Sequence, residues 1–474
     1  MPAFGMRIVY QKTAGRSKGN ERDAGSGPLL RWTRRGGSGK INPMIVKLLL
    51  DRKREGQELA PNEIRELVMA YARGDVPDYQ MAAFAMAVCC RGMTDAETLA
   101  LTTAMRDSGE CLSWDDLPIP TADKHSTGGV GDKLSLIIQP LAAACGLAVP
   151  SLTGRGLGLT GGTADKMESI PGYVAGLPLV DYRRVVAACG CSLTVQTGEI
   201  APADKRLYAL RDVTGTVPSI PLIVASILSK KLAEGAGTLV FDVKCGVGAF
   251  MRTKPDAVAL ARALVAGAKG AGRKAMALVT AMDEPLGFAV GNALEVQEAI
   301  EVLKGTSRAQ DVVDLSVELA ARMVSLAREM PLEEARAQCR ARLADGSAMA
   351  RFAEMVRLHG GDLAAFRRAG DAPFQEIKAA EDGFVASIGA RDVAQAAFEL
   401  GAGRAQSADE IDGAAGVRLL VTRGDQVSAG QPVARLYTRT RPARLEAAER
   451  LVQGAVALSK VPPSPKPLVL EVVE

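Results

Sequence analysis

The sequence is poor in histidine, since His125 and His359 are the only two among 474 residues. Its eight cysteines are scattered along the chain rather than spaced as a disulfide framework. A His/Cys zinc site and a disulfide-stabilised secreted fold are therefore not expected. Buried free thiols in a reducing cytoplasm are expected instead. No apolar run approaches the roughly 18–20 residues that a membrane helix needs, so the protein is expected to act away from membranes.

The net charge of +4 is unevenly distributed. Residues 1–42 carry the whole excess of Lys and Arg, so the rest of the chain is slightly acidic. This segment is rich in Gly and Ser without a secretory apolar region. It lacks the interleaved aromatics of a nucleic-acid-binding arm, so no nucleic-acid partner is expected. A disordered basic extension is predicted here, and translation from Met44 is the alternative.

The pattern of apolar residues predicts an α/β protein with three parts. A small all-helical domain is expected from 43–110 and 203–233, with 80–92 as a buried helix. An α/β phosphate-binding domain with a central mixed sheet is expected from 111–202 and 234–368, because apolar runs there end in Gly- or Ser-rich loops. The helical domain is thus interrupted by the α/β domain, which favours a ligand site between them.

A C-terminal α+β module is expected from 369–455, followed by a Pro-rich tail over 456–474. Residues 423–436 resemble the half-motif of biotinyl and lipoyl carrier domains. The modifiable lysine of those carriers is missing, which favours a structural β-hammerhead module.

The segment Lys124–Lys133, Lys-His-Ser-Thr-Gly-Gly-Val-Gly-Asp-Lys, carries the strongest chemical signal. Glycines let backbone N–H groups approach an anion, and the side chains of Lys124 and Ser126 can reach the same anion. With His125 beside this cradle, the segment points to chemistry on a phosphate-bearing or phosphate-using substrate.

A second glycine cluster spans Thr153–Thr163 and contains G-x-G-x-x-G after an apolar strand, with Asp181 about 20 residues further on. That spacing matches a dinucleotide-binding turn. The run is richer in hydroxyls than such a turn requires, and Asp181 follows Pro178 in what reads as a helix start. Two hydroxyl-rich loops after successive strands are expected to converge on one sheet edge.

A third block comprises residues 201–214 and 219–233. Ser226 and Lys230 are four residues apart on a predicted apolar helix, so they share one face. Taken alone, Lys230 fits equally well as a lysine that extends to solvent at the helix end.

Together these blocks closely resemble the class II nucleoside phosphorylases, the thymidine and pyrimidine-nucleoside phosphorylases. The resemblance covers about residues 44–455. It also includes the run Met282-Asp-Glu-Pro-Leu-Gly and the run Gly401-Ala-Gly-Arg-Ala.

The resemblance implies phosphorolysis of a pyrimidine (deoxy)ribonucleoside to the free base and α-D-(deoxy)ribose 1-phosphate. It implies a phosphate site formed by Lys124, Ser126, Ser135, Thr153 and Thr163. It also implies that Arg211, Ser226 and Lys230 hold the pyrimidine, with His125 near its O2, and that His125, Arg211 and Lys230 are catalytic.

This assignment agrees with the chemistry. Phosphate is already an anion and needs positioning more than activation, which hydroxyls, backbone donors and one lysine supply. The departing pyrimidine anion needs positive charge from Arg211 and Lys230, and His125 can donate a proton. No metal or organic cofactor is required, and phosphate is a co-substrate.

Two departures from the family pattern matter most. Leu159 stands where the family usually has histidine. Lys133 replaces a threonine that helps some bacterial members bind a monovalent cation. The other cation positions match: Gly131, Leu286, Ala289 and Glu298. We hypothesise that the Lys133 ammonium takes the place of the cation and pairs with Glu298.

The resemblance favours a cytoplasmic thymidine phosphorylase acting on thymidine and deoxyuridine in pyrimidine salvage, and it implies a homodimer joined through the helical domain. Three alternatives stay open. A broader pyrimidine-nucleoside phosphorylase would also accept uridine, and Ser151 matches neither subtype. A phosphoribosyltransferase of the same plan, such as an anthranilate phosphoribosyltransferase, would need Mg²⁺. A non-catalytic protein that retained the fold finds its support in Leu159.

Overall fold

The computed structural model describes residues 43–156, 159, 161–366, 372–406 and 409–474. Residues 41–474 form one compact unit. The extension predicted over 1–42 lies outside the described residues.

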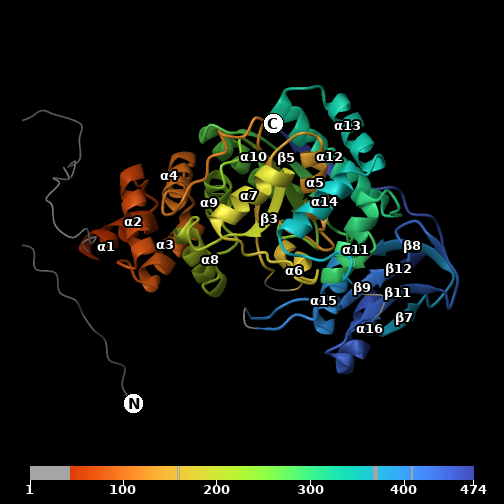
Figure 1. The fold of residues 1–474 in the computed structure, drawn as a ribbon. Helices are drawn as coiled ribbons and strands as arrows, with labels where there is room; N and C mark the ends of the chain where they lie inside the picture. The colour runs from red at the N-terminus through yellow and green to blue at the C-terminus, as the bar shows by residue number, and fades with distance from the viewer. Residues whose placement is uncertain (1–42, 157–158, 160, 367–371, 407–408) are drawn as a thin grey trace, which may run out of the picture. The chain divides into compact units, whose positions relative to one another are not determined.

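Helices from two separate stretches of the chain share one apolar core, which runs from Val46 to Met105 and continues through Leu207 and Leu222. These helices are α1 (Pro43–Arg54), α2 (Pro61–Arg73), α3 (Asp78–Arg91), α4 (Asp95–Arg106), α8 (Pro202–Val213) and α9 (Ile220–Ala233). They form the helical part of the molecule in Figure 1. Helix α9 also packs on α10 (Lys254–Gly270), so it links this core to the α/β part.

Local signals explain where these helices begin and end. Helix α2 begins with Pro61 and ends at Gly74, whose φ of 84° is left-handed and easiest for glycine. Helix α4 begins after Thr94, whose hydroxyl accepts a hydrogen bond from the backbone N–H of Glu97.

Helix α3 differs from the expected buried helix over 80–92. Phe84 and Val88 on one face are buried, whereas Tyr79 is 75% and Met86 44% exposed. The reason is position: α3 packs against α1, α8 and α9 on one side and leaves its other side uncovered. Small apolar residues along a helix therefore did not indicate burial on every face.

The α/β part is built on a four-stranded sheet of order β1-β4-β5-β13. Strands β1 (Ala122–Ser126), β4 (Thr238–Cys245) and β5 (Lys274–Ala281) are parallel. Every residue of β4 is buried, as expected for a strand inside a parallel sheet covered on both faces. The helices of this part are α5 (Leu134–Ala144), α6 (Thr163–Met167), α7 (Leu179–Cys189), α10 (Lys254–Gly270), α11 (Asn292–Leu303), α12 (Gln310–Arg328), α13 (Leu332–Ala344) and α14 (Ser347–Leu358).

A second parallel pair, β2 (Val149–Thr153) and β3 (Cys191–Val195), lies beside the central sheet. One isolated parallel bridge, Thr121 to Ala148, joins the two sheets just before β1 and β2 begin. The strands run side by side from that bridge, so the loops that follow β1 and β2 lie at the same edge.

The predicted tail over 456–474 is wrong in the structure. Strand β12 (Val456–Ser459) pairs with β8 (Gly383–Ile388), and β13 (Val469–Val473) pairs antiparallel with β5 at the edge of the central sheet. The prolines within 462–467 are typical of a tail, whereas the strand forms from the Val-Leu-Glu-Val-Val that follows them. Covering an exposed sheet edge is a common role for such a strand.

The C-terminal part carries two antiparallel sheets, of order β6-β9-β11-β7 and β10-β8-β12. Its elements are β7 (Phe374–Lys378), β8 (Gly383–Ile388), α15 (Ala390–Leu400), β9 (Gly416–Leu419), β10 (Gln426–Val427), β11 (Pro432–Tyr437), η2 (Pro442–Arg444) and α16 (Leu445–Ala455). Strand β6 (Ala289–Val290), which precedes α11, pairs with β9 and so joins this part to the α/β part.

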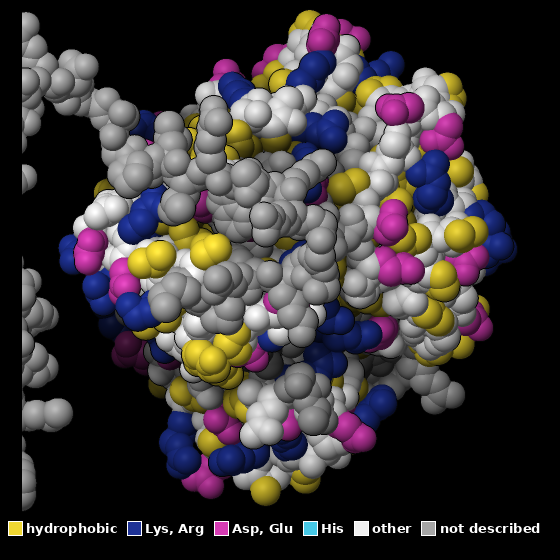
Figure 2. Space-filling view, turned by 90° about the vertical axis from the view of Figure 1, so that its left-hand side faces the viewer, with side chains coloured by type: hydrophobic (Ala, Val, Ile, Leu, Met, Phe, Trp, Pro, Cys, Tyr) yellow, Lys and Arg dark blue, Asp and Glu magenta, His cyan; other side chains and the backbone are white. Residues whose placement is uncertain are grey.

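Surface properties agree only in part with the sequence. Five of the eight cysteines are buried, but Cys90 and Cys111 are exposed and Cys89 is half-buried, so the expectation of buried thiols is wrong for these three. Within the described residues, no helix is both long and apolar enough to cross a bilayer. Acidic and basic side chains are interspersed over the described part of the face in Figure 2.

Candidate active site

Strand β1 carries the functional residues of the first glycine segment on two opposite faces. Side chains alternate along a strand, so Lys124 and Ser126 point to one face and Asp123 and His125 to the other. The contacts agree, since Lys124 meets Asp242 of β4, whereas Asp123 pairs with Lys231 of α9. A single strand thus separates the residues expected to hold phosphate from those expected to meet the base.

On the first face, the phosphate face, Ser126 and Lys124 converge on Asp132. The Ser126 hydroxyl donates to Asp132 Oδ2 at 2.5 Å, and Lys124 Nζ lies 4.0 Å from Asp132 Oδ1. Burial raises the pKa of Asp132, but the ammonium groups of Lys124, Lys244 and Lys166 lower it more, leaving it well below its usual range. The carboxylate therefore marks a point of strong positive potential.

Gly131 of this loop is required by the fold itself. Gly131 has φ +69°, and a Cβ there would lie 2.6 Å from the carbonyl oxygen of Leu286. Any side chain would separate the loop from the segment that precedes β6.

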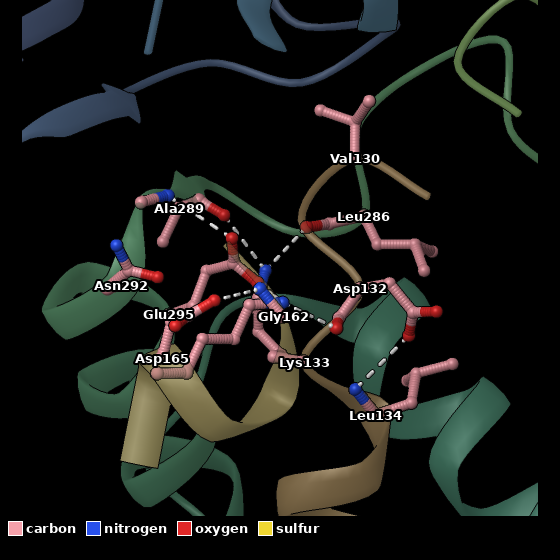
Figure 3. A network of polar contacts seen from close by, with 12 residues as sticks. Val130, Asp132, Lys133, Leu134, Gly162, Asp165, Leu286, Ala289, Asn292 and Glu295 are labelled. Carbon is pink, nitrogen blue, oxygen red and sulfur yellow. Dashed lines mark hydrogen bonds and ion pairs between the residues drawn. The ribbon is translucent and has the colours of Figure 1, made fainter. Parts of the chain in front are cut away.

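Lys133 ends the loop inside a cage of oxygens (Figure 3). Its Nζ lies 2.6 Å from the Leu286 carbonyl, 3.1 Å from the Ala289 carbonyl and 2.7 Å from Glu298 Oε2. The expected ion pair with Glu298 is present. Burial lowers the pKa of Lys133, but Glu298 and Glu295 raise it more, so the ammonium stays charged.

The second glycine cluster is joined to the first by Lys166, whose Nζ donates to the Asp132 carbonyl at 2.8 Å and pairs with Glu295 at 2.7 Å. Thr153 ends β2, Thr163 begins α6 and Ser135 lies in the first turn of α5, all partly exposed. No hydrogen bond joins these three hydroxyls to Lys124 or Ser126 within the described ranges.

Asp165 organises the described part of the second loop. Its Oδ2 accepts from the backbone N–H groups of Gly156 at 2.6 Å and Gly162 at 2.8 Å, and its Oδ1 accepts from Arg404 at 2.8 Å. Asp181 instead lies on α7 in an ion pair with Arg184. The acidic partner of this loop is therefore Asp165, which does not fit a dinucleotide fingerprint.

Leu159 packs against the large hydrophobic core and is partly buried. The side chain that replaces the usual histidine thus contributes apolar contact in a loop of which residues 157, 158 and 160 lie outside the described set.

On the second face of β1, the base face, Ser226 and Lys230 meet as their spacing predicts. Lys230 Nζ donates to Ser226 Oγ at 3.0 Å and to Asp204 Oδ2 of α8 at 2.5 Å. The Lys230 side chain is 21% exposed. It is thus fixed by two partners from two helices and still open to a ligand.

Arg211 is not a free ligand-binding side chain, because backbone carbonyls of the protein hold its guanidinium. It is 2% exposed, and its guanidinium donates to the carbonyls of Thr216, Val217 and Leu222, which precede or begin α9. These three bonds tie the end of α8 to the start of α9. Two of the five N–H donors of an arginine remain for other partners.

His125 is half-buried among cations. Burial lowers its pKa first, and Lys231, Lys230 and Lys124 lower it further, well below the ordinary 6.5. The imidazole is therefore neutral at neutral pH. A neutral ring donates a hydrogen bond rather than a full proton, which changes the role expected from the sequence.

Beneath His125 lies a buried cluster that sequence reasoning missed. Lys231 Nζ donates to Asp123 Oδ2 at 2.5 Å, to Glu234 Oε2 at 2.9 Å and to the Leu152 carbonyl at 3.0 Å. It fastens α9 to β1 and β2. A signal was available: Asp123 and Lys231 each adjoin a predicted site residue, and charged residues in apolar segments need partners.

Comparison with known families covers most of the chain. Residues 47–109 match the glycosyl transferase family helical bundle domain, and residues 119–349 match the a/b domain of that family. Residues 384–459 match the pyrimidine nucleoside phosphorylase C-terminal domain.

Curated relatives are similar over nearly their whole length. The chain is 46% identical over 427 residues to thymidine phosphorylase of Mesorhizobium japonicum, covering 89% of this chain and 97% of that one. It is 48% identical over 416 residues to thymidine phosphorylase of Agrobacterium fabrum, covering 86% and 94%. It is 45% identical over 395 residues to pyrimidine-nucleoside phosphorylase of Geobacillus stearothermophilus, covering 82% and 91%.

Among solved structures, anthranilate phosphoribosyltransferase of Thermus thermophilus matches with a TM-score of 0.55 and 20% identity, covering 65% of this chain and 98% of that one. At this identity the match shows a common fold alone. The long alignments at 44–48% identity carry the assignment: the chain belongs to the family of thymidine and pyrimidine-nucleoside phosphorylases, which are pentosyltransferases.

Proposed function

We propose that this protein catalyses the reversible phosphorolysis of thymidine and deoxyuridine to the free base and 2-deoxy-α-D-ribose 1-phosphate. The observation that carries the proposal is the division of β1. Lys124 and Ser126 point to one face, and His125 points to the other, toward the lysines of α9. A phosphate and a nucleoside base on opposite sides of one strand would place the sugar between them.

In this reaction a phosphate oxygen bonds to C1′ while the bond from C1′ to N1 of the base breaks, and its electron pair stays on the base. Lys230 would stabilise the anionic pyrimidine, and neutral His125 would donate a hydrogen bond to O2. Arg211 would act with its remaining donors while holding the start of α9 in place. Phosphate would be held by Lys124, Ser126, Ser135, Thr153 and Thr163.

No metal or organic cofactor enters this proposal, because the incoming anion and the leaving group need only fixed donors and positive charge. Cytoplasmic pyrimidine salvage is the setting that a phosphate-dependent nucleoside reaction would require.

The direct test is phosphate-dependent release of thymine from thymidine, followed by ultraviolet absorbance. Release that requires both phosphate and thymidine supports the proposal. Absence of release from thymidine, deoxyuridine and uridine alike would refute it. Comparing kcat/KM for thymidine and uridine decides the substrate range, since relatives of similar identity carry both names.

We further propose that Lys133 serves as a built-in cation. Its ammonium contacts two carbonyls and one carboxylate, a donor set that also suits a monovalent metal ion. Activity should then be independent of added K⁺, whereas Lys133→Thr should become K⁺-dependent. A steep rise of wild-type activity with K⁺ would contradict this role.

We propose that the protein is a homodimer joined through its helical part. Large apolar side chains are exposed on three helices of that part: Leu48, Tyr79, Met86, Tyr208 and Val213. Figure 2, viewed from that side, shows hydrophobic side chains at the surface among charged ones. Light scattering of the wild type and of Tyr79→Ser/Val213→Ser tests this, because a dimer through this surface should dissociate in the double variant.

A further inference from the structure

The phosphate face of the central sheet carries more positive charge than the site residues account for. In the parallel register of β1 and β4, Ser126 lies opposite Asp242. Lys244 follows two residues later on β4, so it points to the same face as Asp242, Ser126 and Lys124. This face therefore holds a second lysine that neither the motifs nor the family resemblance indicated.

Lys244 is completely buried and incompletely paired. Its Nζ lies 2.8 Å from Asp242 Oδ2, and Lys124 Nζ lies 3.6 Å from the same oxygen. Neither ammonium makes a hydrogen bond to any described residue. The other oxygen of Asp242 is already taken, because it accepts from the Thr280 hydroxyl at 2.6 Å.

Two buried ammonium groups thus share one carboxylate oxygen. An ammonium has three N–H donors, and buried donors are almost always satisfied in folded proteins. Lys231, on the opposite face of β1, shows the usual arrangement with three acceptors. The unsatisfied donors of Lys124 and Lys244 are therefore expected to face a ligand.

The charge of Lys244 acts on the same point as that of Lys124. Both ammonium groups depress the pKa of Asp132, against the effect of burial, and Asp132 is the carboxylate that binds the Ser126 hydroxyl. The backbone N–H of Lys244 also donates to Thr127 Oγ1 at 2.9 Å, which fixes this end of β4 to the glycine segment.

We propose that Lys244 is a further phosphate-binding residue, whose buried ammonium acts with that of Lys124 on the bound phosphate while Asp242 holds both lysines in position. This inference rests on the proposed function, in which phosphate is the co-substrate. The rival explanation is that Lys244 is only the counter-ion of Asp242.

The two explanations differ in a pair of variants. Lys244→Met should raise the KM for phosphate at least tenfold and leave the KM for thymidine within about twofold. In Asp242→Asn, both Lys124 and Lys244 lose their carboxylate, so this single variant is the reference for Asp242→Asn/Lys244→Met. If Lys244 binds phosphate, the double variant has a higher KM for phosphate than Asp242→Asn alone. If Lys244 is only a counter-ion of Asp242, the two variants have the same KM for phosphate and the proposal is overturned.

Lys53→Met is the matched control. Lys53 is also buried and pairs with a carboxylate, Glu97 at 2.7 Å, but it lies on α1. The Lys53→Met variant should have a lower free energy of unfolding and an unchanged KM for phosphate. If Lys244→Met does not fold, the KM for phosphate of the double variant is compared with that of Asp242→Asn alone, because the double variant leaves no unpaired charge on β4.

Isothermal titration with inorganic phosphate alone separates this inference from the proposed function. Weaker phosphate binding by Lys244→Met supports the inference even if no nucleoside is cleaved, in which case the proposed function alone fails. Equal phosphate binding by wild type and variant overturns the inference even when thymidine phosphorolysis is intact.

Discussion

The two faces of β1 use buried lysines in opposite ways. On the base face, Lys231 finds three acceptors and fastens α9 to β1 and β2. On the phosphate face, Lys124 and Lys244 share one carboxylate oxygen and make no hydrogen bond to the described residues. The lysines on both faces are buried, so they differ in whether their N–H donors find hydrogen-bond acceptors. A satisfied buried lysine indicates a structural role, and an unsatisfied one indicates a place for a ligand.

The base-face cluster should be the most sensitive part of the protein. Lys231→Met leaves the Asp123 carboxylate buried without its cation, so we expect a loss of about 3–5 kcal/mol in the free energy of unfolding, measured by chemical denaturation.

Glu234→Gln is the matched control for Lys231→Met. Burial raises the pKa of Glu234 well above its usual range and Asp123 adds to the effect, which favours the neutral carboxyl, the form that Gln replaces closely. The neutral Glu234 carboxyl stabilises the folded state. This contribution is fully present below the ordinary pKa of 4.5 and is lost as the pH rises through the raised pKa of the folded state. An equal loss of stability in both variants would show that Glu234 is an ionised partner of Lys231.

Lys230 should matter to turnover more than to folding. Lys230→Ala removes the cation expected to stabilise the leaving base, so kcat should fall by about 10²–10³-fold. Steady-state kinetics with thymidine measure this, with Lys205→Ala, an exposed lysine on α8, as the control. An unchanged kcat/KM would mean that the base is bound elsewhere.

Ser126 tests the phosphate face on a smaller scale. Ser126→Ala removes one hydroxyl donor to an anion, so the KM for phosphate should rise about tenfold while the KM for thymidine stays constant. Ser192→Ala, a buried hydroxyl on β3 bonded to His359, should affect stability alone. A change in the thymidine KM instead would show that the two faces do not divide the substrates.

The smallest expected effect is a lowered pKa of the two histidines. Burial lowers the pKa of both His125 and His359, and neighbouring lysines lower that of His125 further. NMR of labelled imidazoles should show both rings neutral at pH 6.5, with His359→Gln assigning the signals. Because their unfolded-state pKa is higher, these rings favour unfolding as the pH falls below about 6.5. A midpoint at or above 6.5 for His125 would remove the argument for a neutral donor.

Much of this arrangement followed from local patterns. The i, i+4 spacing of Ser226 and Lys230 predicted their contact, and the apolar runs predicted β2, β3, β4 and β5. Lys133 paired with Glu298 as the family positions suggested. Local patterns missed the long-range contacts: β13 completes the central sheet after a Pro-rich stretch, and Arg211 binds backbone carbonyls in the loop before α9 and in its first turn.

The sequence by itself determined the kinds of groups present: an anion-binding glycine loop with a histidine, a lysine-bearing apolar helix, and a second hydroxyl-rich loop. Only the tertiary structure decided which buried charges are satisfied. Asp204, Asp123 and Asp242 come from three different elements, and a lysine's partners depend on which strand or helix packs against it. Local sequence sets the direction of a side chain, whereas the acceptors it meets are set by contacts between residues far apart in the chain.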